Sequence, residues 1–111
     1  MAGPRMTLQI QLVLRALLEH PTQELYGLEI CSAAGLRSGT IHPILARLEG
    51  IGWLESRWED IDPVVEGRPR RRYYRLSQDG AERAQNAMAN ARTSISQLPG
   101  LSPGLPYGGT V

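Results

Sequence analysis

The sequence has 111 residues, a formal net charge of +1 and one cysteine, Cys31, which excludes an internal disulfide and is expected to be a buried small hydrophobic residue. This length allows a single domain, whose hydrophobic core is marginal unless the chain forms an oligomer. The N-terminus lacks the pattern of a signal peptide and no stretch approaches the ~20 apolar residues of a membrane span, so we expect a cytoplasmic protein with no membrane partner.

The start of the chain indicates a flexible arm followed by a helix. A glycine and a proline within residues 1–6 discourage regular structure there. Thr7 can cap a first helix that runs to about Glu19, and His20-Pro21 ends it.

A second helix is predicted at residues 25–34, ending at Gly35. The positions expected to face the core are Leu25, Leu28 and Cys31. The preceding residues 22–24 could add a minor strand to a later hairpin.

A third helix, residues 38–51, has two contrasting faces. Ile41, Leu45 and Leu48 recur at steps of four and three, which predicts one buried face. Ser38 and Thr40 offer side-chain oxygens at its start. The opposite face is made mostly of small residues, namely Gly39, His42, Pro43, Ala46 and Gly50. An unpartnered surface helix would normally carry long polar residues there, so this face is expected to allow close approach of something large.

A hairpin follows, with strands predicted at residues 53–60 and 71–76. The connecting residues 61–70 contain two prolines and a glycine, so we expect a projecting loop rather than a tight turn. Five arginines, Arg68, Arg70, Arg71, Arg72 and Arg75, lie within eight residues that contain no acid. Such a cluster is typical of phosphate-backbone binding, although a solvated charged loop is the alternative.

The last predicted helix, residues 77–98, begins at Ser77 as its cap. Small and apolar residues recur at alternating steps of three and four, which is a heptad seam suited to a partner helix. The positions expected to mediate dimerisation are Ala81, Ala84, Met88, Ala91 and Ile95, with Leu98 at the end of the seam. Packing on the first helix of the same chain is the alternative. Residues 99–111 are rich in proline and glycine and predict a disordered tail.

The order of these pieces resembles the PadR-type transcriptional regulators, a winged helix-turn-helix family. The resemblance covers roughly residues 8 to 90. Its matching blocks are Leu12 to Leu18, Leu25 to Ile30, Ser38 to Leu45, Arg47 to Glu49, Gly52 to Leu54 and Arg71 to Ser77. The family usually has tyrosine where this chain has His42, so a phenol contact to the DNA backbone is replaced by an imidazole.

The resemblance implies a mainly helical α+β fold, with a winged helix-turn-helix domain at residues 7–76 and a C-terminal dimerisation helix. It implies a sequence-specific DNA-binding regulator, most simply a homodimeric repressor acting on double-stranded DNA at a pseudo-palindromic operator. The third helix would enter the major groove, and the arginine-rich wing would lie on the backbone or in the minor groove. The candidate DNA-binding residues are Arg37, Ser38, Thr40, His42, Arg47, Arg68, Arg70 and Arg71.

The sequence also bears on two other classes of function. The chain has two histidines, no glycine-rich phosphate loop and no metal-ligand spacing, so we expect neither an enzyme nor a cofactor or metal. A protein-binding adaptor or antirepressor on the same fold stays open, because four acids flank the wing arginines. A small-molecule effector is possible but unsupported, since the last helix has no aromatic residue before Tyr107.

Overall fold

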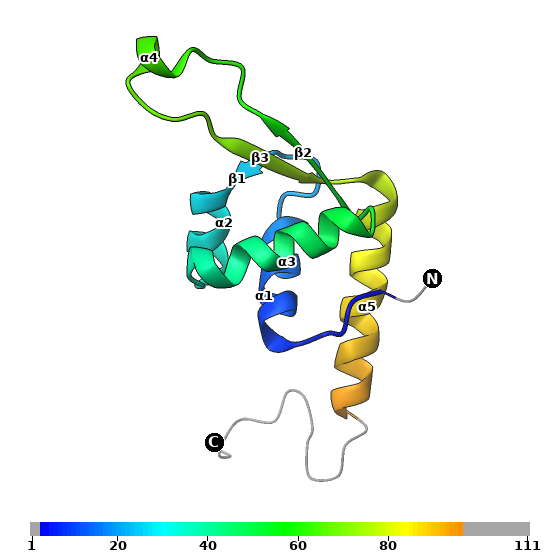
Figure 1. Cartoon of the computed structure of the whole chain (residues 1–111). Helices are drawn as coiled ribbons and strands as arrows, with labels where there is room; N and C mark the ends of the chain where they lie inside the picture. Colours follow the sequence, from blue (N-terminus) through cyan, green and yellow to red (C-terminus); the bar gives the residue numbers. More distant parts are fainter. Residues whose placement is uncertain (1–2, 97–111) are drawn as a thin grey trace.

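The computed structural model describes the backbone of residues 3–96 and the side chains of residues 3–91 (Figure 1). The predicted tail, residues 99–111, and the seam residue Leu98 lie outside this part of the chain. The elements in chain order are α1 (Leu8–Leu18), β1 (Leu25–Tyr26), α2 (Gly27–Ala34), α3 (Ser38–Gly50), β2 (Leu54–Trp58), α4 (Pro63–Glu66), β3 (Arg72–Leu76) and α5 (Gln78–Ser96). This is the mainly helical α+β architecture that the sequence predicts.

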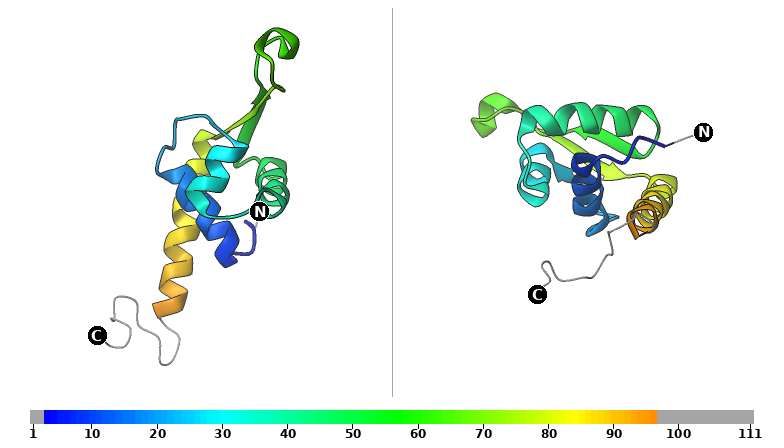
Figure 2. Two further views of the ribbon diagram at one scale, coloured as in Figure 1. Left: turned by 90° about the vertical axis from the view of Figure 1, so that its left-hand side faces the viewer. Right: turned by 90° about the horizontal axis from the view of Figure 1, so that it is seen from below.

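The strands form one antiparallel sheet in the order β1-β3-β2. β2 and β3 pair from Leu54 opposite Leu76 to Trp58 opposite Arg72. Beyond that pair the connecting loop projects away from the helices and forms the wing, as Figures 1 and 2 show. The predicted projecting loop is therefore confirmed. It also contains the short helix α4, which the sequence pattern did not predict.

The core lies where α1, α3 and the inner face of the sheet meet. Val13 and Leu14 of α1 and the apolar line of α3 are completely buried. In α3 that line consists of Ile41, Leu45 and Leu48, as predicted. Burying one such aliphatic side chain stabilises the fold by about 1.5–3 kcal/mol. Burial of all three therefore fixes the orientation of α3 about its own axis.

The second helix differs from its prediction in start and in facing. Residues 25 and 26 form β1, which pairs with β3, whereas residues 22–24 are not in a strand. Because α2 begins at Gly27, its inward positions change, and Leu28 is 69% exposed while Ile30 is buried. The pairing of β1 with a distant strand overrides the local helical pattern.

Helix caps follow the prediction at two of three helices. The Thr7 hydroxyl accepts a hydrogen bond from the Ile10 amide at 3.2 Å, and the Ser77 hydroxyl accepts one from the Gly80 amide at 2.9 Å. At α3, however, the cap residue is Arg37, which makes no side-chain cap bond, and Ser38 is already helical.

The residues before α1 pack on the body of the protein where the structure describes them. Pro4 is buried, and the side-chain Nε2 of Gln11 donates to the Met6 carbonyl at 3.0 Å. A Cβ on Gly3 would approach the Trp53 ring at 2.9 Å. Residues 3–6 are therefore not the free arm that the sequence suggests.

Helix α5 runs beside α1, as the views in Figures 1 and 2 agree. Ala84 is completely buried there, within the core of its own protomer. Ala81 and Met88 are only partly buried against the same core. Within residues 3–96, no helix combines the length and the apolarity needed to cross a bilayer.

The start of α5 approaches the β2 entry so closely that only glycine fits. A Cβ on Gly80 would lie 2.1 Å from the Trp53 carbonyl oxygen, which is backbone and cannot move aside. We expect Gly80→Ala to destabilise the protein by about 1–3 kcal/mol or more, because overpacking forces backbone shifts. Urea denaturation would measure this loss. Gly50→Ala is the matched control, since a Cβ there meets no atom within 4 Å, and it should be neutral or stabilising. Equal stabilities for both variants would contradict the packing at Gly80.

Candidate nucleic-acid interface

The outward face of α3 is bare of long side chains except at two positions. Gly39, Pro43, Ala46 and Gly50 are all exposed, and His42 and Arg47 are the exposed polar side chains among them. A Cβ on Gly39 or Gly50 would meet no atom within 4 Å, and neither glycine has a positive φ. The fold itself therefore does not require glycine at these two positions.

A groove of about 340 Å³ separates the beginning of α3 from the wing strand β3. We call it the interface groove, and its lining residues are Tyr26, Gly27, Leu28, Cys31, Ser38, His42, Arg68, Pro69, Arg70, Arg71, Arg72 and Tyr74. Five predicted DNA-binding residues meet here, namely Ser38, His42, Arg68, Arg70 and Arg71. His42 lies against the start of α2, where its Cε1 would be 3.4 Å from a Cβ on Gly27.

The other three predicted residues lie on α3 outside this groove. Arg37 is exposed at the N-cap, Thr40 is half-buried in the first turn, and Arg47 is exposed in the last turn. The predicted set is thus divided between the groove and the outward face of the helix.

The wing arginines have different environments. The Arg68 guanidinium makes two hydrogen bonds to the Glu59 carboxylate, at 2.7 and 2.8 Å, so its charge is neutralised within the protein. Arg71 lies over the Tyr26 ring at 4.3 Å. Arg70 is exposed, and its Nε donates to the Ile61 carbonyl at 3.0 Å. Among the described residues no acceptor pairs with the two terminal nitrogens of Arg70, which leaves them available for an anion.

Glu59 is the residue that orders the base of the wing. Besides Arg68, its carboxylate accepts a hydrogen bond from the backbone amide of Arg71 at 3.1 Å. The hydrogen bonds from the Arg68 guanidinium, with a smaller contribution from the Arg71 amide, lower the pKa of Glu59 to about 2. The carboxylate is therefore ionised at neutral pH and joins the two sides of the loop.

Glu49, near the end of α3, connects this helix to the sheet. Its carboxylate accepts a hydrogen bond from the Ser56 hydroxyl of β2 and lies 3.7 Å from the Arg72 guanidinium of β3. Arg72 in turn lies over the Trp58 ring at 5.0 Å. These contacts fix the position of the wing relative to α3.

On the face of the sheet that carries Arg57 and Arg75, both arginines form ion pairs with acids. Arg57 is paired with Glu24 at 2.7 Å, and Arg75 with Glu55 at 3.2 Å. Among the described residues of the wing, Arg70 and Arg71 are the arginines without a carboxylate partner, and both line the interface groove. No group of metal-binding side chains occurs among the residues that the structure describes.

Sequence reasoning missed several residues of this site. Tyr26 and Gly27 enter the groove because β1 pairs with β3, whereas the sequence predicted the pairing strand at residues 22–24. Arg72 could have been found, because it belongs to the same arginine cluster as Arg70 and Arg71.

The core of three helices is followed by a projecting β-hairpin, and one of these helices, α3, presents a face of small residues beside that hairpin. These features define a winged helix protein. The family model described as the transcriptional regulator PadR-like family matches residues 13–86. The chain therefore belongs to the PadR-like family of transcriptional regulators.

Solved structures agree with this fold. A PadR family transcriptional regulator from Eggerthella lenta DSM 2243 is 23% identical, with 78% of this chain and 77% of that chain covered and a TM-score of 0.62. Disulfide-formed AbfR is 29% identical, with 85% of this chain and 61% of that chain covered and a TM-score of 0.62. Overoxidized AbfR bound to DNA is 27% identical, with 86% and 62% covered and a TM-score of 0.62. The chain thus spans less than two thirds of AbfR. No curated protein matches the sequence.

The lowered pKa of Glu59 gives its contribution to stability a defined pH window. Because the folded pKa, about 2, lies below the ordinary value of 4.5, this stabilisation is present above pH 4.5 and is lost as pH falls toward 2. We expect Glu59→Gln to be less stable than wild type at neutral pH, with the difference shrinking through that window. Thermal denaturation at a series of pH values would measure it. The control Glu82→Gln, on the exposed side of α5, should show no such pattern, and a pH-independent difference at Glu59 would contradict the ion pair.

Proposed function

We propose that this regulator is a homodimeric, sequence-specific DNA-binding repressor that inserts α3 into the major groove of a pseudo-palindromic operator. The observation that carries the proposal is the outward face of α3. The exposed positions Gly39, Pro43, Ala46 and Gly50 carry small side chains or none, and no neighbour excludes a side chain at either glycine. A surface helix without a partner favours long polar residues at such positions, so close approach of a large partner accounts for this face.

The interface groove supports DNA as that partner. Its arginines, the Ser38 hydroxyl and the His42 imidazole line the space between α3 and the wing. A phosphate backbone passing beside a helix in the major groove would lie in this space, where Arg70 and Arg71 can approach it. The neighbour AbfR has been solved bound to DNA, which is further support for a DNA-binding role.

Direct recognition of DNA bases by α3 would depend on few side chains. Arg47 and His42 are the exposed polar residues of the α3 face, and Arg47 can make paired hydrogen bonds to a guanine. Such a small set implies that part of the specificity comes from the shape and deformability of the DNA.

Helix α5 supplies the proposed dimer contact. Ala84 is buried within the protomer, so we leave it out of that surface. Ala81, Met88 and Ala91 are half-buried in the single chain, and Ala91 is not packed against the protomer core. A hollow of about 340 Å³ between α1 and α5, lined in part by Leu18 and Met88, leaves apolar surface for a partner to cover. The side chain of Ile95 lies outside the described part of the chain.

Gly39→Ala tests the proposed function because it should weaken DNA binding without lowering stability. Gly39 lies in the first turn of α3, so the substitution should leave the free energy of unfolding unchanged or raise it by less than about 1 kcal/mol. It should weaken DNA binding, because the added methyl group faces the floor of the DNA major groove. Denaturation and fluorescence-anisotropy titrations would measure the two effects. If wild type bound DNA with no dependence on salt, or did not bind, the adaptor alternative would replace the repressor proposal.

Ala91→Glu tests the dimer. Two carboxylates brought together by a two-fold axis would repel each other, so the variant should be more monomeric than wild type in sedimentation equilibrium. Asn90→Glu, on an exposed position of the same helix, is the control with the same added charge. A wild-type protein that remained monomeric at micromolar concentration would contradict the α5 interface.

A further inference from the structure

Trp58 is an unusual residue for the end of a wing strand. Its side chain is 59% exposed, whereas the other tryptophan, Trp53, is 5% exposed in the core. Trp58 lies opposite Arg72 in the β2–β3 pairing, and the Arg72 guanidinium 5.0 Å from the ring restrains it. Because Trp58 contributes little to the core, its role must be sought at the surface.

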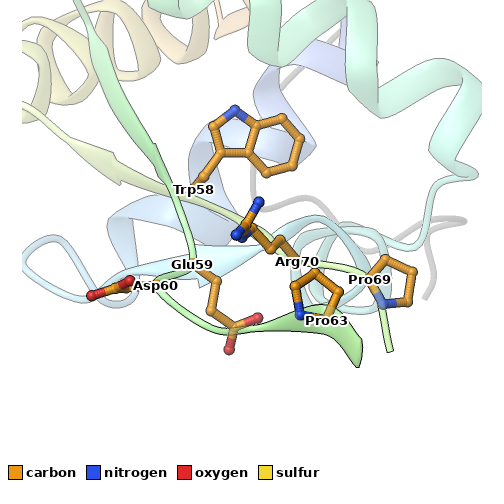
Figure 3. Close-up of a pocket in the computed structure, with 6 residues that line it drawn as sticks. All are labelled: Trp58, Glu59, Asp60, Pro63, Pro69 and Arg70. Atoms are coloured by element: carbon orange, nitrogen blue, oxygen red, sulfur yellow. The ribbon is translucent and has the colours of Figure 1, made fainter. Parts of the chain in front are cut away.

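A second hollow, of about 740 Å³, opens beside this ring (Figure 3). We call it the wing hollow, and it is lined by Trp58, Glu59, Asp60, Pro63, Pro69 and Arg70. Pro69 and Arg70 also line the interface groove, so the two concavities adjoin at these residues. A DNA strand bound in the interface groove at Arg70 would therefore lie near Trp58.

The chemistry of the wing hollow combines apolar surface with one available positive group. In Figure 3 the Arg70 guanidinium projects toward the Trp58 ring, while the Asp60 carboxylate is turned away from both. The other acid, Glu59, is already neutralised by Arg68. The hollow therefore favours a ligand with an apolar ring-shaped part beside an anion, which is the pattern of a deoxyribose and its phosphate.

We propose that the wing hollow extends the DNA interface, with a deoxyribose packed on Trp58 and the adjoining phosphate held by the terminal nitrogens of Arg70. This inference rests on the proposed DNA-binding function and adds an apolar contact at a defined place to it. Packing on an aromatic ring releases no counterions, whereas a guanidinium–phosphate contact does. Trp58 should therefore contribute affinity that does not depend on salt.

Salt titrations of three variants separate these contributions. Trp58→Ala should weaken DNA binding several-fold at every salt concentration and leave the slope of log affinity against log salt unchanged, since the lost contact is apolar and releases no counterions. Arg70→Ala should lower the slope by about 0.9. Val64→Ala removes an apolar side chain of the wing that is 89% exposed and lines neither concavity, so it should bind like wild type.

Intrinsic fluorescence gives a second readout. DNA should quench the emission of wild type, while Trp58→Phe, in which the buried Trp53 is the remaining indole, should show no quenching. Trp58→Phe keeps an aromatic face and should retain most of the affinity that Trp58→Ala loses.

Three results would overturn the inference. If Trp58→Ala bound DNA as tightly as wild type, Trp58 would not belong to the interface, and the proposed function would stand. If Trp58→Ala lowered the salt slope as much as Arg70→Ala does, the ring would act only by positioning a charged side chain. Absence of salt-sensitive DNA binding by wild type would overturn the proposed function, and this inference with it.

Discussion

Burial of one face of α3 is the constraint on which the rest of the structure depends. Ile41, Leu45 and Leu48 are completely enclosed, and successive helical positions are separated by about 100°. The rotation that buries these three side chains also turns Gly39, His42 and Arg47 to the outside. A rotation large enough to hide the bare face would expose the apolar line to water. The core thus determines which residues a partner can reach.

The wing depends on acids placed among its arginines. Glu59 neutralises Arg68 and holds the Arg71 backbone, and Glu49 connects α3 to both β2 and β3. Each ion pair lowers the positive charge available to a phosphate. In exchange the loop has a defined shape, and Arg70 remains unneutralised at the junction of the interface groove and the wing hollow. Arg71, which lies over the Tyr26 ring, likewise has no carboxylate partner among the described residues, so two positioned arginines face the interface groove.

Local patterns predicted the parts of the fold that are stabilised locally. The buried line of α3 and the caps at Thr7 and Ser77 follow from periodicity and side-chain chemistry. The minor strand was predicted at residues 22–24 but forms at residues 25 and 26, because pairing with β3, far along the chain, determines its position. The neutralisation of Arg68 was missed for a related reason, since the loop must fold before Glu59 can reach it. Ala84 belongs to a regular seam, and only the packing of α5 on α1 shows that it faces the protomer's own core.

The proposed reading of DNA by the outward face of α3 can be measured by selecting bound fragments from a random pool, with the full chain and with Arg47→Ala. Wild type should enrich two inverted half-sites about 10 base pairs apart. Arg47→Ala should lose the preference at one base pair in each half-site, at a cost of about 1–3 kcal/mol, and keep the others. Enrichment of no sequence by wild type, or an identical preference in both proteins, would contradict the account.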